Sequence, residues 1–88
     1  MKTIAIDYYG VIRRDSELVD GAKESIERLS KDYNLIVFTT ENVVVAQQWL
    51  RAHGITLNVT NTKPVAQVYI DDRALRFVSW YDVCKYFL

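Results

Sequence analysis

The pattern of apolar and polar positions along the chain predicts strands and helices in alternation. Apolar runs over residues 2–7 and 35–38 predict two strands with buried centres. Weaker runs predict a third strand within residues 55–59 and a fourth over residues 66–70. Residues 8–19 lack a regular apolar pattern and are expected to form an irregular loop.

Three helices are expected between and after these strands. Apolar side chains recur at helical spacing over about residues 21–31, where Asp20 is expected to cap the first helix. A second helix is predicted over residues 39–53, and Gly54 is expected to end it. A capping-box pattern over residues 79–82 predicts the start of a third helix.

This succession of strands and helices predicts an α/β sandwich around a parallel sheet. We expect a single domain over residues 1–88, because the chain is long enough for one modest hydrophobic core. The place of the third strand stays open. Only about six residues separate it from the fourth strand, whereas a parallel crossover needs about a dozen or more.

Polar side chains stand where three of the predicted strands end. Asp7 ends the first strand, Thr39 follows the second, and Asp71 and Asp72 follow the fourth. Ligands of parallel α/β sheets bind beyond the carboxyl ends of the strands. Each residue alone could be a turn or cap residue, but three strand ends of this kind together predict a functional site.

Composition narrows the choice of partners. Eleven basic residues balance eleven acidic ones, so no nucleic-acid partner is expected. The longest strongly apolar run, residues 35–38, is too short to cross a bilayer, so no membrane partner is expected either. A single cysteine, Cys84, and a start without a signal-peptide pattern favour the cytoplasm. Trp49, Trp80, Tyr81 and Tyr86 are expected at the core or its rim, and those of them that are exposed could form a homodimer surface.

The strand-end residues resemble the motifs of the haloacid dehalogenase-like (HAD) superfamily, a group of aspartate-nucleophile hydrolases that are mostly phosphatases. Residues 7–10 resemble the first motif, Thr39 the second, and residues 63–64 the third. The segment Tyr-Ile-Asp-Asp-Arg-Ala at residues 69–74 resembles the fourth motif and is close to that of small capless members from bacteria and phages. The resemblance covers nearly the whole chain.

By this resemblance, the fold would be a three-layer Rossmann-like sandwich. Its small, mostly parallel sheet would have the strand order 4-1-2, with the third strand uncertain. No insertion of 60–100 residues interrupts the chain, so the resemblance implies no cap domain.

The resemblance also implies a chemistry for a small phosphorylated substrate. Asp7 would attack phosphorus to form an aspartyl-phosphate, Thr39 would bind a phosphoryl oxygen, and Lys63 would neutralise charge near Asp7. A Mg²⁺ cofactor would reduce the repulsion between the anionic nucleophile and the anionic substrate. Its implied ligands are Asp7, the backbone carbonyl of Tyr9, and Asp71 or Asp72.

Tyr9 departs from the phosphatase pattern, because these phosphatases have a general acid–base aspartate at its position. Tyrosine, with an ordinary pKa of about 10, is a poor base at neutral pH, so turnover is expected to be slow. One alternative is a catalytically impaired protein that keeps the fold for binding or assembly. Another is a dehalogenase, because residues 7–10 also resemble the metal-free haloacid dehalogenases. Tyr9 could instead simply pack over the turn.

Two further positions affect how an anion would be bound. Glu41 stands where similar small members often have arginine, and it would either repel an anion or complement a helix dipole in the first turn. Lys63 can act at the site only if the chain folds back before the fourth strand, because an extended segment would hold it too far from Asp71. The other candidate anion contacts are Arg13, Arg14 and Arg73.

Overall fold

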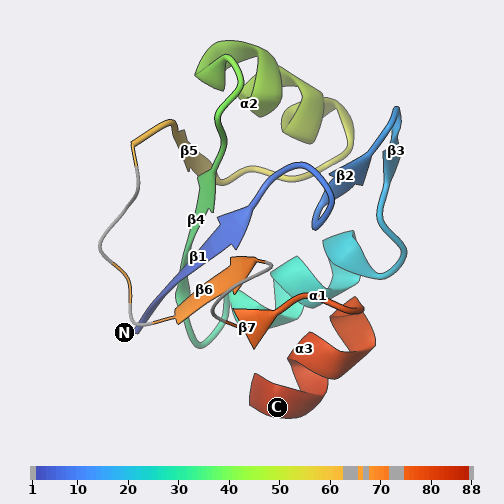
Figure 1. Ribbon diagram of the computed structural model, residues 1–88, viewed down its shortest axis with the longest axis vertical. Coiled ribbons are helices and arrows are strands. Elements are labelled where there is room, and N and C mark those ends of the chain that lie inside the picture. The colour runs from blue at the N-terminus through green and yellow to red at the C-terminus, as the bar shows by residue number, and fades with distance from the viewer. Residues whose placement is uncertain (1, 63–65, 67, 72–74, 88) are drawn as a thin grey trace.

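Strand β1, Thr3–Asp7, lies at the centre of a five-stranded sheet with the spatial order β5-β4-β1-β6-β7 (Figure 1). The computed structural model describes residues 2–62, 66, 68–71 and 75–87. All four strand pairings in this sheet are parallel. The other strands of the sheet are β4 (Asn34–Phe38), β5 (Asn58–Thr60), β6 (Val68–Asp71) and β7 (Leu75–Arg76).

The sequence correctly predicted the inner strand order. The predicted fourth, first and second strands are β6, β1 and β4, and they are neighbours in that order. The third predicted strand is β5. It forms a short edge strand beside β4, with Val37 paired to Val59. The third strand, whose place the sequence analysis left open, is therefore part of the sheet. Strand β7, paired with β6 at the opposite edge, was not predicted.

One face of the sheet carries the hydrophobic core. Side chains alternate between the two faces of a strand, and the pairings place Ile4 beside Leu35 and Ile6 beside both Val37 and Ile70. All five side chains are buried in a single hydrophobic cluster. This cluster also contains buried side chains from each of the three helices: Ala22, Ile26, Leu29, Ala46, Leu50, Trp80 and Val83.

The three helices therefore pack on the same face of the sheet, as Figure 1 shows. They are α1 (Ala22–Leu29), α2 (Val43–Ala52) and α3 (Trp80–Phe87). On the opposite face, Ile36 and Tyr69 are half-buried and lie outside the core cluster. The described residues thus form two layers, and the predicted third layer is not found among them.

The order in which the chain visits the strands explains the two layers. Helices α1 and α2 connect β1 to β4 and β4 to β5, two steps in the same direction across the sheet. Right-handed crossovers place both helices on one face. The return from β5 to β6 would carry a helix on the other face, but residues 61, 62 and 66 of this connection are not helical.

The starts of the first two helices differ from the sequence predictions. Asp20 does not cap α1; the N-cap is Gly21, which has φ +80° and makes no side-chain cap hydrogen bond. Helix α2 begins at Val43 rather than at residues 39–40, because the Asn42 side chain accepts a hydrogen bond from the backbone N–H of Val45. The predicted end of α2 is confirmed, since Gly54 follows the C-cap in the left-handed region.

The predicted loop over residues 8–19 contains a small antiparallel hairpin, formed by β2 (Arg13–Arg14) and β3 (Glu17–Leu18). Asp15 lies at its turn with φ +56°, a left-handed conformation that aspartate tolerates better than most residues. The indole N–H of Trp80, in α3, donates a hydrogen bond of 2.9 Å to the carbonyl of Val11. This bond ties the last helix to the turn that leads into the hairpin.

Candidate functional site

The backbones of three predicted site residues meet at the carboxyl edge of the sheet. Asp7 is the last residue of β1 and pairs with Phe38, so Thr39 follows directly on the neighbouring strand. Asp71 ends β6, where the register pairs Ile6 with Ile70. Because Ile6 and Ile70 are paired, the residues that follow them, Asp7 and Asp71, occupy neighbouring backbone positions at the ends of two adjacent strands.

The predicted metal site can be compared with the structure only in part. Lys63 and Asp72 lie outside the described residues, and so does the side chain of Asp71. In the part of the chain that the structure describes, no three His, Cys, Asp or Glu side chains are grouped as metal ligands. The residue type at these two adjacent strand ends is aspartate, whose carboxylate oxygens are hard donors of the kind that Mg²⁺ prefers.

Asp7 is half-buried and has a defined local contact. Its Oδ1 accepts a hydrogen bond of 3.0 Å from the backbone N–H of Tyr8. The same N–H donates to the carbonyl of Phe38 at 3.1 Å, which extends the β1–β4 ladder past the end of the strand. The carboxylate is thus oriented by the turn that follows it.

Thr39 is buried and holds the chain between β4 and α2. Its Oγ1 accepts a hydrogen bond of 3.0 Å from the N–H of Glu41, and its own N–H donates to the carbonyl of Thr60 at 2.9 Å. Only 2% of Thr39 is exposed, so in this conformation its hydroxyl contacts the turn rather than solvent. Glu41 precedes the N-cap Asn42, so the expectation that it lies in the first helical turn is wrong.

The hydroxyl of Tyr9 binds the tip of the hairpin. It donates a hydrogen bond to Oδ1 of Asp15 at 3.2 Å and accepts one from the N–H of Asp15 at 3.1 Å. The Tyr9 side chain is 51% exposed, and its backbone bridges to Arg13. The sequence singled out Tyr9 but missed Asp15; its only available signal was an aspartate, which tolerates the left-handed region, at the centre of a polar loop.

Arg13 is braced from three sides. Its Nε donates to the carbonyl of Asp15 at 2.6 Å, and Nη1 donates to the hydroxyl of Tyr8 at 3.1 Å. Its guanidinium carbon lies 4.8 Å from the centre of the Trp49 ring, within range of a cation–π contact. The hydrogen bond with Tyr8 raises the pKa of Arg13 above its ordinary value, and Glu41 contributes in the same direction. The candidate anion contact Arg13 thus serves first to join the hairpin to α2.

The neighbouring aromatic side chains complete this brace. Trp49 meets Tyr8 edge to face and stacks on His53, with ring centroids 3.8 Å apart. Nδ1 of His53 lies 2.8 Å from the carbonyl of Trp49, so that nitrogen carries the proton.

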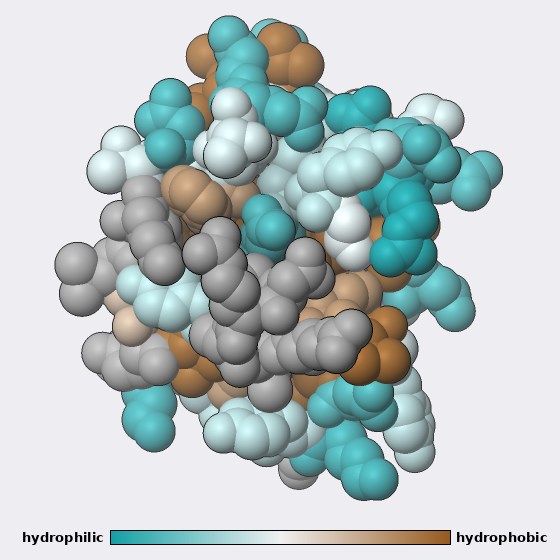
Figure 2. Space-filling model, viewed as in Figure 1, coloured by the Kyte–Doolittle hydropathy of each residue, from teal (hydrophilic) through white to brown (hydrophobic). Residues whose placement is uncertain are grey.

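Arg14, the other cation of the hairpin, donates from Nη2 to the carbonyl of Gly10. On the face of the molecule drawn in Figure 2, the surface around the hairpin is largely hydrophilic.

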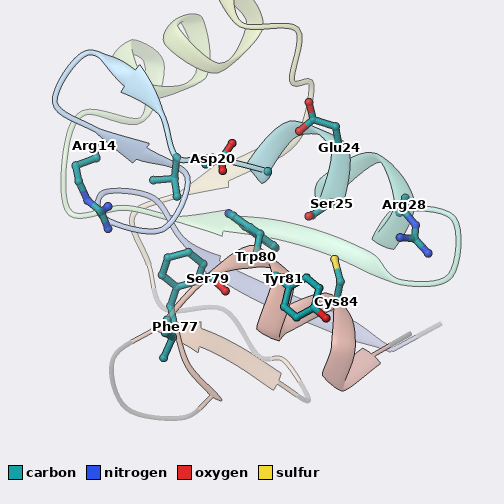
Figure 3. Close-up of a pocket in the computed structure, with 13 residues that line it drawn as sticks. Arg14, Asp20, Glu24, Ser25, Arg28, Phe77, Ser79, Trp80, Tyr81 and Cys84 are labelled. Atoms are coloured by element: carbon teal, nitrogen blue, oxygen red, sulfur yellow. The ribbon is translucent and has the colours of Figure 1, made fainter.

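A cavity of about 620 Å³ lies away from Asp7, between the hairpin, α1 and α3 (Figure 3). Its walls combine apolar side chains such as Phe77 and Trp80 with both charge signs, from Arg14 and Glu24. A second cavity of about 330 Å³ lies near the amino end of β4, around Asn34. Among the described residues, the candidate anion contact Arg14 lines the first cavity, whereas Asp7, Tyr9 and Thr39 line neither.

In the described part of the chain, no helix has the length and apolar character needed to cross a membrane.

The chain was compared with protein-family models, with curated proteins and with solved structures, and the outcome was the same for all three. Neither the protein-family models, nor the curated proteins, nor the solved structures contain a match to this chain.

Proposed function

We propose that this chain is a HAD-like hydrolase that acts on a small phosphate ester through an aspartyl-phosphate on Asp7. The observation that supports the proposal most is the position of Asp7, at the carboxyl end of the central strand. The strands on both sides also end in polar residues, Thr39 after β4 and Asp71 in β6. Sheets of this class bind ligands at such an edge.

In the proposed reaction, an oxygen of Asp7 bonds to phosphorus while the bond from phosphorus to the leaving oxygen breaks. Water then attacks the aspartyl-phosphate, releasing phosphate and restoring the carboxylate. The N–H of Tyr8 orients Asp7. Thr39 would bind a phosphoryl oxygen, and Lys63 would neutralise charge, as the motif resemblance implies. Bound Mg²⁺, held by Asp7, the Tyr9 carbonyl, and Asp71 or Asp72, would supply charge neutralisation.

One observation favours a second candidate, a protein of this fold that binds or assembles without turnover. The phenol of Tyr9 is committed to Asp15 through two hydrogen bonds. Donating its proton to a leaving group would require breaking that contact. Proton transfer by a positioned group typically contributes about 10²–10⁴-fold, so turnover without it is slow.

Phosphate release from an aryl phosphate tests the leading proposal. We expect slow, Mg²⁺-dependent release by the wild-type protein and none by Asp7→Asn, because the amide cannot attack phosphorus. Asp32→Asn, an exposed carboxylate in the turn after α1, is the matched control and should leave the rate unchanged. Equal release by wild type and by folded Asp7→Asn would eliminate the aspartyl-phosphate mechanism. Mg²⁺ binding without turnover would favour the second candidate.

We also propose that the protein forms a homodimer. Three of its exposed large apolar side chains, Val78, Tyr81 and Tyr86, lie on α3 or just before it. Aromatic side chains are enriched at the cores of protein interfaces.

A further inference from the structure

We infer that Tyr9 is a positioning residue for the proposed reaction, whose hydroxyl latches the tip of the β2–β3 hairpin to the turn that follows Asp7. The inference has two parts. The latch itself stands on contacts between described residues. Its effect on turnover rests on the proposed function.

The first step is the hydrogen-bonding capacity of the phenol. A tyrosine hydroxyl has one proton to donate and two lone pairs to accept with. The proton of Tyr9 goes to Oδ1 of Asp15, and one lone pair receives the N–H of the same residue. Tyr9 thus holds both the side chain and the backbone of Asp15, which a phenylalanine of the same shape could not do.

The second step is the conformation of Asp15. Its φ of +56° lies in the left-handed region, where a residue other than glycine carries a conformational cost. Two hydrogen bonds to one hydroxyl offset that cost. Tyr9 therefore holds the hairpin at its residue of positive φ, Asp15.

The third step is what the latched turn holds in place. The carbonyl of Asp15 accepts the 2.6 Å hydrogen bond from Nε of Arg13, whose guanidinium reaches Tyr8 and Trp49. Tyr8 in turn donates its N–H to the carboxylate of Asp7. A continuous series of contacts therefore runs from the Tyr9 hydroxyl through the hairpin to the residue that orients the proposed nucleophile.

Amide hydrogen exchange tests the latch without any need for activity. In Tyr9→Phe, the Asp15 N–H loses its acceptor, and we expect its exchange to quicken by roughly two- to tenfold, the range for one net hydrogen bond. The N–H of Val19, bonded to Ile12 at the base of the hairpin, should stay protected. Tyr33→Phe is the matched control, because the Tyr33 ring packs against Phe87 and the residue lies outside both the hairpin and the proposed dimer surface. Unchanged Asp15 exchange in folded Tyr9→Phe overturns the latch.

Kinetics of aryl phosphate hydrolysis separate positioning from proton donation. We expect Tyr9→Phe and Asp15→Ala to lower kcat to a similar degree, roughly two- to tenfold, with KM nearly unchanged, because a less well oriented Asp7 attacks phosphorus more slowly. The double variant should be no worse than either single one. Asp15→Asn keeps an acceptor oxygen, the backbone N–H and tolerance of the left-handed region, so it should have the wild-type kcat.

A different kinetic pattern contradicts the inference. If Tyr9 donates a proton, Tyr9→Phe should lower kcat by about 10²-fold or more and remove the alkaline limb of the pH profile. In that case Asp15→Ala should keep the wild-type kcat. If the wild-type protein shows no turnover, the proposed function fails, while amide exchange still decides the latch. Failure of the latch and failure of the phosphatase proposal are thus distinguishable.

Discussion

At the scale of single residues, the contact between Tyr9 and Asp15 changes how substitutions at Tyr9 should be designed. Tyr9→Asp introduces the carboxylate that the resemblance to HAD phosphatases implies at this position, but it also removes both hydrogen bonds to Asp15. It would place a second negative charge near the Asp15 carboxylate, and like charges repel. In Tyr9→Asp alone, a gain in rate from the new acid–base group could be offset by loss of the contacts that hold the hairpin turn. A small net change in rate would therefore not reveal either effect.

The double variant Tyr9→Asp with Asp15→Asn separates these two effects. Asparagine tolerates the left-handed turn and carries no charge. If the rest of the proposed site is competent, we expect the double variant to hydrolyse an aryl phosphate about 10²–10⁴-fold faster than the wild-type protein, measured as kcat with Mg²⁺. Asp15→Asn alone is the control and should show no such gain. A folded double variant that binds Mg²⁺ and stays inert would rule out the phosphatase proposal.

The sequence predicted the positions of those candidate site residues that lie at the ends of strands, and not the contacts made within loops. The meeting of Asp7, Thr39 and Asp71 follows from apolar runs that each end in a polar residue. The pairing of Tyr9 with Asp15 could not be foreseen, because it depends on a left-handed residue inside a segment without apolar periodicity. The contact between Arg13 and Trp49 joins a loop to a helix, and local patterns carry no information about such pairings.

At the scale of elements, helix starts were the least predictable feature. Several residues before α2 can cap a helix, among them Thr39, Thr40 and Asn42. The structure uses Asn42, since Thr39 is occupied by the turn at Glu41. At α1, the left-handed Gly21 takes the N-cap position in place of Asp20. The order of the inner strands, which the motif resemblance implied, agrees with the structure.

Two alanine substitutions test this assignment of caps. Asn42→Ala removes the acceptor for the Val45 N–H and should lower the free energy of unfolding by about 1 kcal/mol. Asp20→Ala, at the position where the sequence predicted a cap, should change it by less than about 0.5 kcal/mol. Urea denaturation of both variants measures the difference. A larger loss in Asp20→Ala than in Asn42→Ala would contradict the observed helix starts.

At the scale of the whole molecule, the three helices share one face of the sheet, and α3 presents apolar side chains to solvent. Val78, Tyr81 and Tyr86 are each more than two-thirds exposed, whereas Trp80 and Val83 of the same segment are buried. Helix α3 therefore uses one side for the core and leaves aromatic surface on the other. This distribution is the basis for the proposed homodimer.

Sedimentation equilibrium tests the homodimer. We expect the wild-type protein to have twice the mass of one chain, and Tyr81→Ser with Tyr86→Ser to shift it towards the monomer, because burial of the two rings is lost. Val44→Ser is the matched control, since Val44 is an exposed apolar residue on α2 and lies outside the proposed interface. A monomeric wild-type mass at working concentration would exclude the dimer.

The central position of β1 also has a consequence for how the protein is made. Strand β1 is synthesised before the other strands of its sheet, and one of its partners, β6, follows only after α1 and α2. The bond from Trp80 to Val11 spans 69 residues. Until β6 emerges, a nascent chain keeps one edge of its central strand unpaired, the kind of surface that recruits other strands. The β1–β6 pairing, which covers this edge, can therefore form only late in synthesis.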